Sequence, residues 1–471
     1  MSKLLPNLPI EDLTTENDYI GIIKKGTLLK SFFLKNKHEF SQIKIFAIYG
    51  EWGSGKSTLM KYLEKELKGS FNTFFFESWE FESDNNLAHS LLEFLTNESN
   101  TTSNTLLKNG SKLVEGFAKS VTFKTPFANF NMDKMIEEVD KTSFLERKEQ
   151  FKKDFREWEN KITTKYKSPD YNIVFIDDLD RCEPENILNL LSAIKLFFTY
   201  GKKTIFLCGI DKKAIKEAVM NKYGDVVKSN EYLEKIFDIS FSMPDGIANY
   251  KLIYHYFGDE KFYDDLTTVL ICKFFDELNF KNPRRIKKIL NKYLIIKRLV
   301  EANKSNEFIL PNIMTKDSGN MFETYLTLYF LILAEFEPKI YKDLFDFNKK
   351  RINYTDALKR SNLNSTEINN ISQNIFNYYN EKILYNSAFR TNDKVFFRMF
   401  LFNLLPLKVD TINSNFLIDS SSFSRYFHVE LKTIEYFFTL FIFENESEIN
   451  IEIKKMNLTL LDYKRMISNL I

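Results

Sequence analysis

Short apolar runs alternate with amphipathic segments through the first half of the chain. Five runs of four to seven residues are rich in β-branched or aromatic side chains, which is typical of buried strands: Ile43–Tyr49, Asn72–Glu77, Ile173–Ile176, Thr204–Gly209 and Phe237–Ser242. Segments with apolar positions at helical spacing lie between them, at Thr58–Leu67, Ile187–Phe198 and Lys212–Asn221. Because strands and helices take turns along the chain, we predict an α/β fold with a parallel sheet and helices on both of its faces.

Beyond about residue 305 the pattern becomes helical and aromatic. Met321–Ala334, Val395–Leu407 and Ile434–Phe443 are apolar segments, and Asp317–Asn320 marks a turn before the first of them. None of these segments carries a chemical motif, so we interpret them as helix cores and not as cofactor contacts. This part of the chain, residues 305–471, is therefore predicted to be an all-helical C-terminal domain.

A polar interval separates the second and third predicted strands, over about residues 97–170. It begins with Asn97–Asn104, which is a predicted loop, and ends with the charged helical run Met132–Ile162. That run carries apolar residues at spacings of seven, four and three, which places one apolar stripe on a solvated helix: Phe144, Phe151, Phe155 and Trp158. We expect one stretch of this interval, Val114–Phe130, to pack on the core or on a partner. Peripheral membrane contact through the aromatic, weakly basic segment Val114–Phe130 is the alternative.

The composition limits which cellular compartment and which kinds of partner we expect for this protein. The 471 residues carry a net charge of +2, which gives no global attraction to nucleic acid or membranes. Three widely spaced cysteines, Cys182, Cys208 and Cys272, are interpreted as thiols in a reducing cytoplasm, and the four histidines form no metal motif. The longest uncharged apolar stretch, Thr324–Ala334, is about half the ~20 residues that a membrane span requires. We therefore expect a cytoplasmic protein without an integral membrane span.

A complete G-x-x-x-x-G-K-S phosphate loop follows the first predicted strand and opens the first predicted helix. This arrangement aims backbone N–H groups and a positive helix end at one point, which suits a polyphosphate. Glycines let the backbone approach the phosphates, Lys56 would reach the β- and γ-phosphates, and the Ser57 hydroxyl would bind Mg²⁺. The predicted nucleotide-binding residues are Gly50, Glu51, Trp52, Gly53, Ser54, Gly55, Lys56, Ser57 and Thr58.

Acidic residues follow the third predicted strand, at the sheet edge where open α/β folds bind ligands. Asp177, the first acid after the strand, is predicted to hold Mg²⁺ together with Ser57. Asp178 is placed to orient or deprotonate an attacking water. Arg181 either senses the γ-phosphate or pairs with neighbouring carboxylates.

Together, the phosphate loop and the Asp-Asp-Leu-Asp-Arg-Cys block resemble the KAP family of P-loop NTPases. Further segments agree with this resemblance over about residues 12–300: Phe75–Trp79, Phe206–Asp211, Tyr232–Phe237 and Asn282–Lys287. Many members of the family carry transmembrane helices in the interval that is polar here. The resemblance implies an NTPase core over residues 1–245 and a helical lid over residues 246–304. Because the interval is polar here, we expect no transmembrane insertion in it.

The resemblance also implies roles for residues outside the two motifs. A catalytic acid beside the Mg²⁺ acid suggests the subgroup with an additional strand between the phosphate-loop strand and the acidic strand. Asp211 ends that strand and either contacts the γ-phosphate water or caps the following helix. In the lid motif, Arg284 either reaches the nucleotide phosphates or belongs to a solvated basic helix, and a DNA-binding patch lacks support from any motif. ATP is the expected nucleotide, because no guanine-selective Asn-Lys-x-Asp loop is present.

Two hypotheses of function follow. The first is a Mg²⁺-dependent ATPase that works as a homo-oligomer or drives a separate effector protein. The second is a slow, nucleotide-gated scaffold whose ATP occupancy controls partner binding. Relatives of the family without membrane spans resemble components of bacterial anti-phage and plasmid-exclusion systems, which implies a defence role.

Overall fold

The structure is a computed structural model of the chain. It describes residues 3–84, 86–99, 107, 141–163, 169–223, 226–243, 249–258, 266–277, 280–303, 310–314, 321–336, 338, 341 and 465–469. The backbone contacts divide the chain into two units: a sheet unit, Leu8–Ile247, and a helical unit made of Met1–Asn7 and Ala248–Ile471. The division into core, lid and C-terminal domain stays a prediction. Several predicted segments lie outside the described residues: Val114–Phe130, Asp317–Asn320, Val395–Leu407 and Ile434–Phe443.

The sheet unit contains a five-stranded sheet in which every neighbouring pair is parallel. The strand order is β2-β3-β4-β1-β5. The strands are β1 (Ile45–Tyr49), β2 (Asn72–Glu77), β3 (Asn172–Asp177), β4 (Thr204–Ile210) and β5 (Ile239–Ser242). Because β4 lies between β1 and β3, the predicted additional strand and the α/β fold class are both confirmed.

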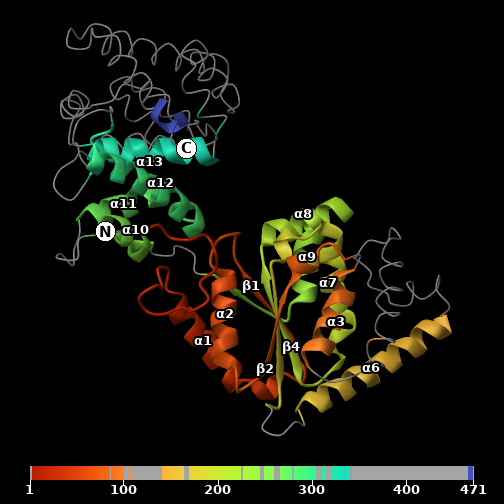
Figure 1. The fold of residues 1–471 in the computed structure, drawn as a ribbon. Helices are drawn as coiled ribbons and strands as arrows, with labels where there is room; N and C mark the ends of the chain where they lie inside the picture. Colours follow the sequence, from red (N-terminus) through yellow and green to blue (C-terminus); the bar gives the residue numbers. More distant parts are fainter. Residues whose placement is uncertain are drawn as a thin grey trace, which may run out of the picture. The chain divides into compact units, whose positions relative to one another are not determined.

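Helices cover both faces of this sheet (Figure 1). One face packs against α1 (Ile22–Lys35) and α2 (Lys56–Leu67). The other face packs against α3 (Leu87–Glu98), α6 (Lys141–Thr163), α7 (Pro184–Leu196), α8 (Lys212–Tyr223) and α9 (Val226–Ile236). Short 3₁₀ turns complete the unit: η1 (Lys37–Glu39), η2 (Ser78–Phe81), η3 (Leu179–Arg181) and η4 (Phe198–Tyr200).

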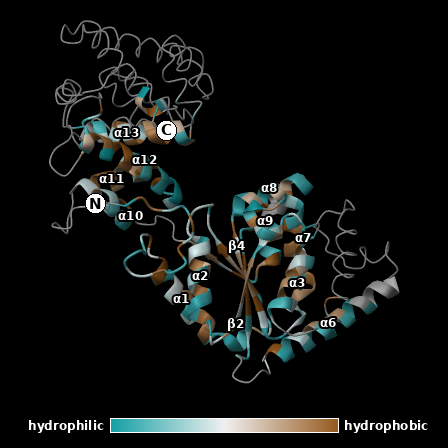
Figure 2. Ribbon diagram, viewed as in Figure 1, coloured by the Kyte–Doolittle hydropathy of each residue, from teal (hydrophilic) through white to brown (hydrophobic). Residues whose placement is uncertain are grey.

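Alternation along β3 explains how one strand serves two cores. Ile173 and Phe175 belong to the core under α1 and α2, whereas Val174 and Ile176 belong to the core on the other face. Side chains of a strand point to opposite faces in turn, so a strand covered on both faces is apolar at every position. Figure 2 shows the hydrophobic strands between helices whose outer surfaces are hydrophilic.

The apolar stripe of α6 lies in the core on the α3 and α7 side. Phe151, Phe155 and Trp158 are fully buried there, and the indole Nε1–H of Trp158 donates to Ser99 Oγ at 3.0 Å. The described part of this helix therefore packs on the core, whereas the prediction for Val114–Phe130 lies outside the described residues. The side chain of Phe144 lies outside the described residues.

The helical unit contains α10 (Tyr250–Phe257), α11 (Leu266–Glu277), α12 (Pro283–Ala302) and α13 (Met321–Phe336). Helix α12 begins after Asn282, whose side chain accepts the backbone N–H groups of Arg284 and Arg285. The N-terminal segment packs on α12, where Asn291 donates to the carbonyl of Leu5 and accepts its N–H. Among the described residues, no helix is both long and apolar enough to cross a membrane.

Candidate nucleotide-binding site

The phosphate loop forms a sharp connection between β1 and α2. It begins where Gly50 donates its backbone N–H to the carbonyl of Ile210 at 3.0 Å, and it ends at Lys56, the first residue of α2. Gly53 and Gly55 have φ angles of 82° and 96°, in the left-handed region that glycine adopts without steric cost. The sequence folds as a loop here because these glycines accept a backbone path that other residues disfavour.

Two observations indicate that the interior of the loop fits a polyphosphate. A Cβ placed on Gly50 would lie 2.4 Å from Ser54 Oγ, so the backbone is tightly wrapped at this point. Ser54 Oγ itself is buried and finds no hydrogen-bond partner among the described residues. A buried hydroxyl without a partner is costly, and a phosphate oxygen would satisfy it. The first turn of α2 adds the positive end of the helix dipole.

Lys56 bonds to its own loop. Its Nζ donates to the carbonyls of Gly50 and Glu51 at 2.9 and 3.1 Å, and the residue is 6% exposed. An ammonium whose hydrogen bonds go to neutral backbone carbonyls is a strong donor for an anion. The arrangement therefore places a cation beside the wrapped backbone.

Ser57 and Asp177 meet at the carboxyl end of the sheet. The Ser57 hydroxyl hydrogen-bonds to the Asp177 carboxylate, although the two residues lie on α2 and β3. Burial raises the pKa of Asp177, and the Ser57 hydrogen bond, the Asp178 backbone N–H and the charge of Lys56 oppose that shift. A hydroxyl and a buried carboxylate are oxygen ligands of the kind that Mg²⁺ takes beside phosphate oxygens. The residues present therefore fit the metal.

Asp178 follows directly and has an unusual backbone. Its φ of 56° is the one positive value for a non-glycine residue in the described part of the chain. Its carboxylate pairs with Arg181, with 3.2 Å between Oδ1 and Nε. Burial and the neighbouring charge of Asp177 raise the pKa of Asp178 to about 6. A carboxyl group with such a pKa suits proton transfer near neutral pH.

Asp211 joins the phosphate loop to the additional strand β4. Its Oδ2 accepts the backbone N–H of Trp52 at 3.0 Å, and its Oδ1 accepts the N–H of Lys213 at 2.9 Å. The second bond caps α8, as one of the two interpretations of Asp211 stated. Lys213 also pairs with Glu51 at 2.9 Å across an exposed surface. The residues that follow β4, Asp211 and Lys213, thus bind two residues of the phosphate loop, Trp52 and Glu51.

Three further features were missed from sequence. A Cβ on Gly209 would lie 2.9 Å from both Asp177 Oδ1 and Met60 Sδ, so the space beside the Asp177 carboxylate fits only a glycine. The Cδ1 atoms of Ile20 and Ile22 lie 2.9 and 3.2 Å from a Cβ built on Gly55, so an apolar segment covers the loop. A glycine inside an apolar strand was a usable signal of close approach. Nothing in the pattern around Ile20 indicated the second contact.

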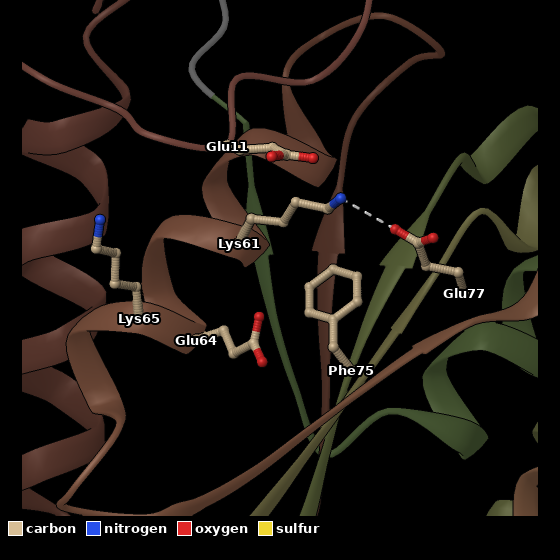
Figure 3. Close-up of a pocket in the computed structure, with 6 residues that line it drawn as sticks. All are labelled: Glu11, Lys61, Glu64, Lys65, Phe75 and Glu77. Carbon is tan, nitrogen blue, oxygen red and sulfur yellow. Dashed lines mark ion pairs between the residues drawn. The ribbon is translucent and has the colours of Figure 1, made fainter. Parts of the chain in front are cut away.

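The third missed feature is Glu77, which ends β2 in register with Asp177 on β3. Lys61 pairs with Glu77 at 3.1 Å, and this pairing raises the pKa of Lys61 against the effect of burial. Figure 3 shows the pair at one side of a hollow of about 420 Å³, where the Lys61 chain extends from α2 towards Glu77. The hollow is lined by Glu11, Lys61, Glu64, Lys65, Phe75 and Glu77. Lys61 thus offsets the negative charge of Glu77, which lies in register with Asp177.

The remaining predicted site residues bond elsewhere. The Thr58 hydroxyl accepts the backbone N–H of Ile10 at 3.3 Å. Arg284 lies in the helical unit, where its guanidinium donates to the carbonyl of Asn7 at 3.0 Å. On the same helix, Lys288 and Lys292 pair with Glu335, and Lys287 donates to the carbonyl of Pro6. Nucleotide contact by Arg284 stays a prediction.

A parallel sheet with the order described, a wrapped glycine loop opening a helix, and a serine and an aspartate meeting beside it define a P-loop nucleotide-binding protein. A sequence model of the KAP family P-loop domain matches residues 33–251. The chain belongs to the KAP family of P-loop NTPases.

Two curated relatives are uncharacterized proteins of Methanocaldococcus jannaschii. MJ0181 is 39% identical over 112 residues, which cover 22% of this chain and 44% of that protein. MJ0182 is 31% identical over 170 residues, which cover 28% of this chain and 88% of that protein. The chain therefore spans less than half the length of MJ0181. Neither name states an activity.

Solved structures of the Aeropyrum pernix ORC2 protein also resemble the chain. The form with ADPNP and ADP has a TM-score of 0.37 and 11% sequence identity, and covers 96% of this chain and 97% of that chain. The ADP form has a TM-score of 0.32 and the same identity, and covers 85% and 88% of the two chains.

Proposed function

We propose that the chain binds ATP with Mg²⁺ and hydrolyses it. The observation that carries this proposal is the hydrogen bond between the Ser57 hydroxyl and the buried Asp177 carboxylate, beside a wrapped phosphate loop. Hydrolysis requires a metal held next to the γ-phosphate, and these two side chains supply oxygen ligands from two different elements. When bound, the metal would draw negative charge from the phosphoryl oxygens.

In this proposal, different residues of the chain bind the phosphates, prepare the attacking water and hold the loop. The backbone of Gly50–Lys56 and the Ser54 hydroxyl bind phosphate oxygens, and Lys56 exchanges its loop carbonyls for the β- and γ-phosphates. Asp178 accepts a proton from the attacking water or orients it. Asp211 holds the loop in shape through Trp52.

The test is steady-state ATP turnover by the wild-type protein beside Asp178→Asn, with ATP affinity measured for both by calorimetry. The proposal expects turnover to fall by about 100-fold or more, which is the lower end of the range for a lost general base, while affinity changes less than threefold. Equal turnover by two proteins that bind ATP equally well would contradict it.

A nucleotide-gated scaffold without turnover is the second candidate. The ion pair between Asp178 and Arg181 favours it, because the guanidinium lowers the pKa of Asp178 against the effects of burial and of Asp177, and so makes this carboxylate a weaker base than it would be without Arg181. The turnover comparison decides between the two candidates, since the scaffold binds ATP without hydrolysing it.

The wider role is proposed from the family resemblance. ATP binding would drive or gate a separate effector protein, with the chain acting in the cytoplasm as a homo-oligomer, and Arg284 would reach the nucleotide from the lid. Anti-phage defence is the proposed setting. The test is phage plating on cells that express the chain with its neighbouring genes, where Lys56→Ala is expected to abolish protection that the wild type gives.

A further inference from the structure

The turn after β3 is held in place by its own backbone and side chains. Asp178 adopts a left-handed backbone conformation, with a φ of 56°, which is strained for most L-residues. Arg181 closes the turn over it: the Arg181 backbone N–H donates to the Asp178 carbonyl at 3.2 Å, and its Nε lies 3.2 Å from Asp178 Oδ1. A strained residue persists where its surroundings fix it, and Arg181 contributes two of the bonds that do so.

Arg181 in turn contacts a residue of the turn that follows the neighbouring strand β2. Its Cζ lies 5.2 Å from the centroid of the Trp79 ring. Trp79 belongs to η2, which follows β2, and the register of Glu77 with Asp177 places η2 beside η3. The guanidinium thus lies over an aromatic face, a contact worth more when it is shielded from water.

The position of Trp79 is otherwise hard to explain. The residue is 55% exposed, and a large apolar side chain gains little from burial in such a place. A second contact joins the same two segments, because Glu82 accepts the backbone N–H of Glu183 at 2.6 Å. The segments after β2 and β3 are therefore in contact at two points, one at Arg181 and one at Glu183.

We propose that Trp79 and Arg181 are positioning residues that fix the carboxylate of Asp178 for its role in hydrolysis. The proposal rests on the proposed function, in which Asp178 prepares the attacking water. Neither Trp79 nor Arg181 bonds to the phosphate loop in the contacts described above. Their loss is therefore expected to reduce kcat and to leave nucleotide binding intact.

The kinetic test uses matched substitutions at the two positions. Trp79→Ala is expected to lower kcat by about tenfold, with KM and ATP affinity changed less than twofold, and Trp79→Phe to retain at least half of kcat because an aromatic face remains. Leu28→Ala, at a 63% exposed position on α1, is the control for removing an exposed apolar side chain. Loss of ATP affinity in step with kcat would overturn the proposal.

A double substitution tests whether the two residues act through one another. If Trp79 works only by seating Arg181, Trp79→Ala together with Arg181→Ala lowers kcat no further than Arg181→Ala alone. If the fold-decrease of kcat in the double variant equalled the product of the fold-decreases in the two single variants, this part of the proposal would be overturned. Arg181→Lys separates charge from shape, because a lysine keeps the charge and lacks the planar group that stacks on the ring.

A fluorescence measurement tests the geometry without turnover. The chain has three tryptophans, Trp52, Trp79 and Trp158, and the emission of Trp79 is the difference between the spectra of the wild type and Trp79→Phe. Arg181→Ala, compared with the same variant carrying Trp79→Phe, is expected to change that emission by at least 20%. Unchanged emission would overturn the stacking. A wild type without turnover would instead overturn the proposed function, while the emission result would still decide the contact.

Discussion

The backbone N–H of Trp52 donates to Oδ2 of Asp211 at 3.0 Å, so the phosphate loop is tied to the end of β4. The other oxygen of Asp211 caps α8 through the N–H of Lys213. One carboxylate thus sets both the outer part of the loop and the start of the next helix. The insertion of β4 beside β1 is what brings this carboxylate within reach.

We predict that Asp211→Ala weakens ATP binding. The substitution removes two charge-assisted hydrogen bonds, and a loss of about 1.5 kcal/mol in loop organisation lowers affinity roughly tenfold. Calorimetric titration with ATP measures the change. Lys213→Ala is the matched control, because it removes the exposed pair with Glu51 and keeps the backbone N–H, so its affinity stays within about twofold. Equal losses in the two variants would contradict the role given to Asp211.

Gly209→Ala is predicted to weaken the metal site selectively. The added methyl would lie 2.9 Å from Asp177 Oδ1 and from Met60 Sδ, and one of them must shift. The concentration of Mg²⁺ that gives half-maximal turnover is expected to rise about tenfold, and metal-free nucleotide binding to change little. A variant with an unaltered Mg²⁺ requirement would show that Asp177 tolerates the methyl group.

Asp238 is predicted to stabilise the sheet unit in a pH-dependent way. Its carboxylate accepts the N–H groups of Lys44 and Ile45 at 2.8 and 3.0 Å and pairs with Lys195 at 2.8 Å. Burial alone would raise the pKa of Asp238, but Lys195 and the two N–H groups lower it overall. The folded state therefore favours the charged carboxylate. Its contribution is complete above about pH 4 and is lost as the pH falls through the lowered pKa.

Asp238→Asn is expected to reduce the free energy of unfolding by about 1–3 kcal/mol at pH 7. Urea unfolding followed by circular dichroism at pH 7, 5 and 3.5 measures the difference. The gap between wild type and variant should be the same at pH 7 and 5 and should narrow at pH 3.5. A gap that widens in acid would mean that the sign of the pKa shift is wrong.

Trp158→Ala is predicted to destabilise the sheet unit by about 3–5 kcal/mol, because the side chain is fully buried in the core. Urea unfolding measures this, with Leu28→Ala on exposed α1 expected to stay within about 0.5 kcal/mol of the wild type. If the two variants unfolded at the same urea concentration, the packing of α6 on the core would be wrong.

The strands and the two motifs could be predicted from sequence because they depend on local pattern, whereas the additional strand was expected only from the family resemblance. Apolar runs with β-branched residues define buried strands, and the glycine spacing defines the loop. The stripe on α6 was also readable, but whether Trp158 faces a core or a partner was not, since an amphipathic helix has the same pattern in both cases.

The tertiary details of the site lay beyond the sequence. The approach of Gly209 to Asp177 and the seating of Arg181 on Trp79 depend on the register of neighbouring strands, which residue pattern alone does not set. For Arg181 the two interpretations stayed open, and the structure shows the pairing with Asp178. For Asp211, the structure shows the predicted cap of α8 and also a bond to the backbone N–H of Trp52, which the sequence did not indicate. Contact of Asp211 with the γ-phosphate water stays a prediction.

ATP affinity of Lys56→Ala, measured by calorimetry beside the wild type and Lys65→Ala, tests the central claim most directly. Lys65 lies on the same helix, and its replacement removes the same charge from an exposed pair with Asp12. The account predicts that Lys56→Ala binds ATP at least tenfold more weakly, from the loss of a charge-assisted bond of about 1.5–3 kcal/mol, and that Lys65→Ala binds as the wild type does. Undiminished affinity in Lys56→Ala would show that the glycine loop does not hold the phosphates.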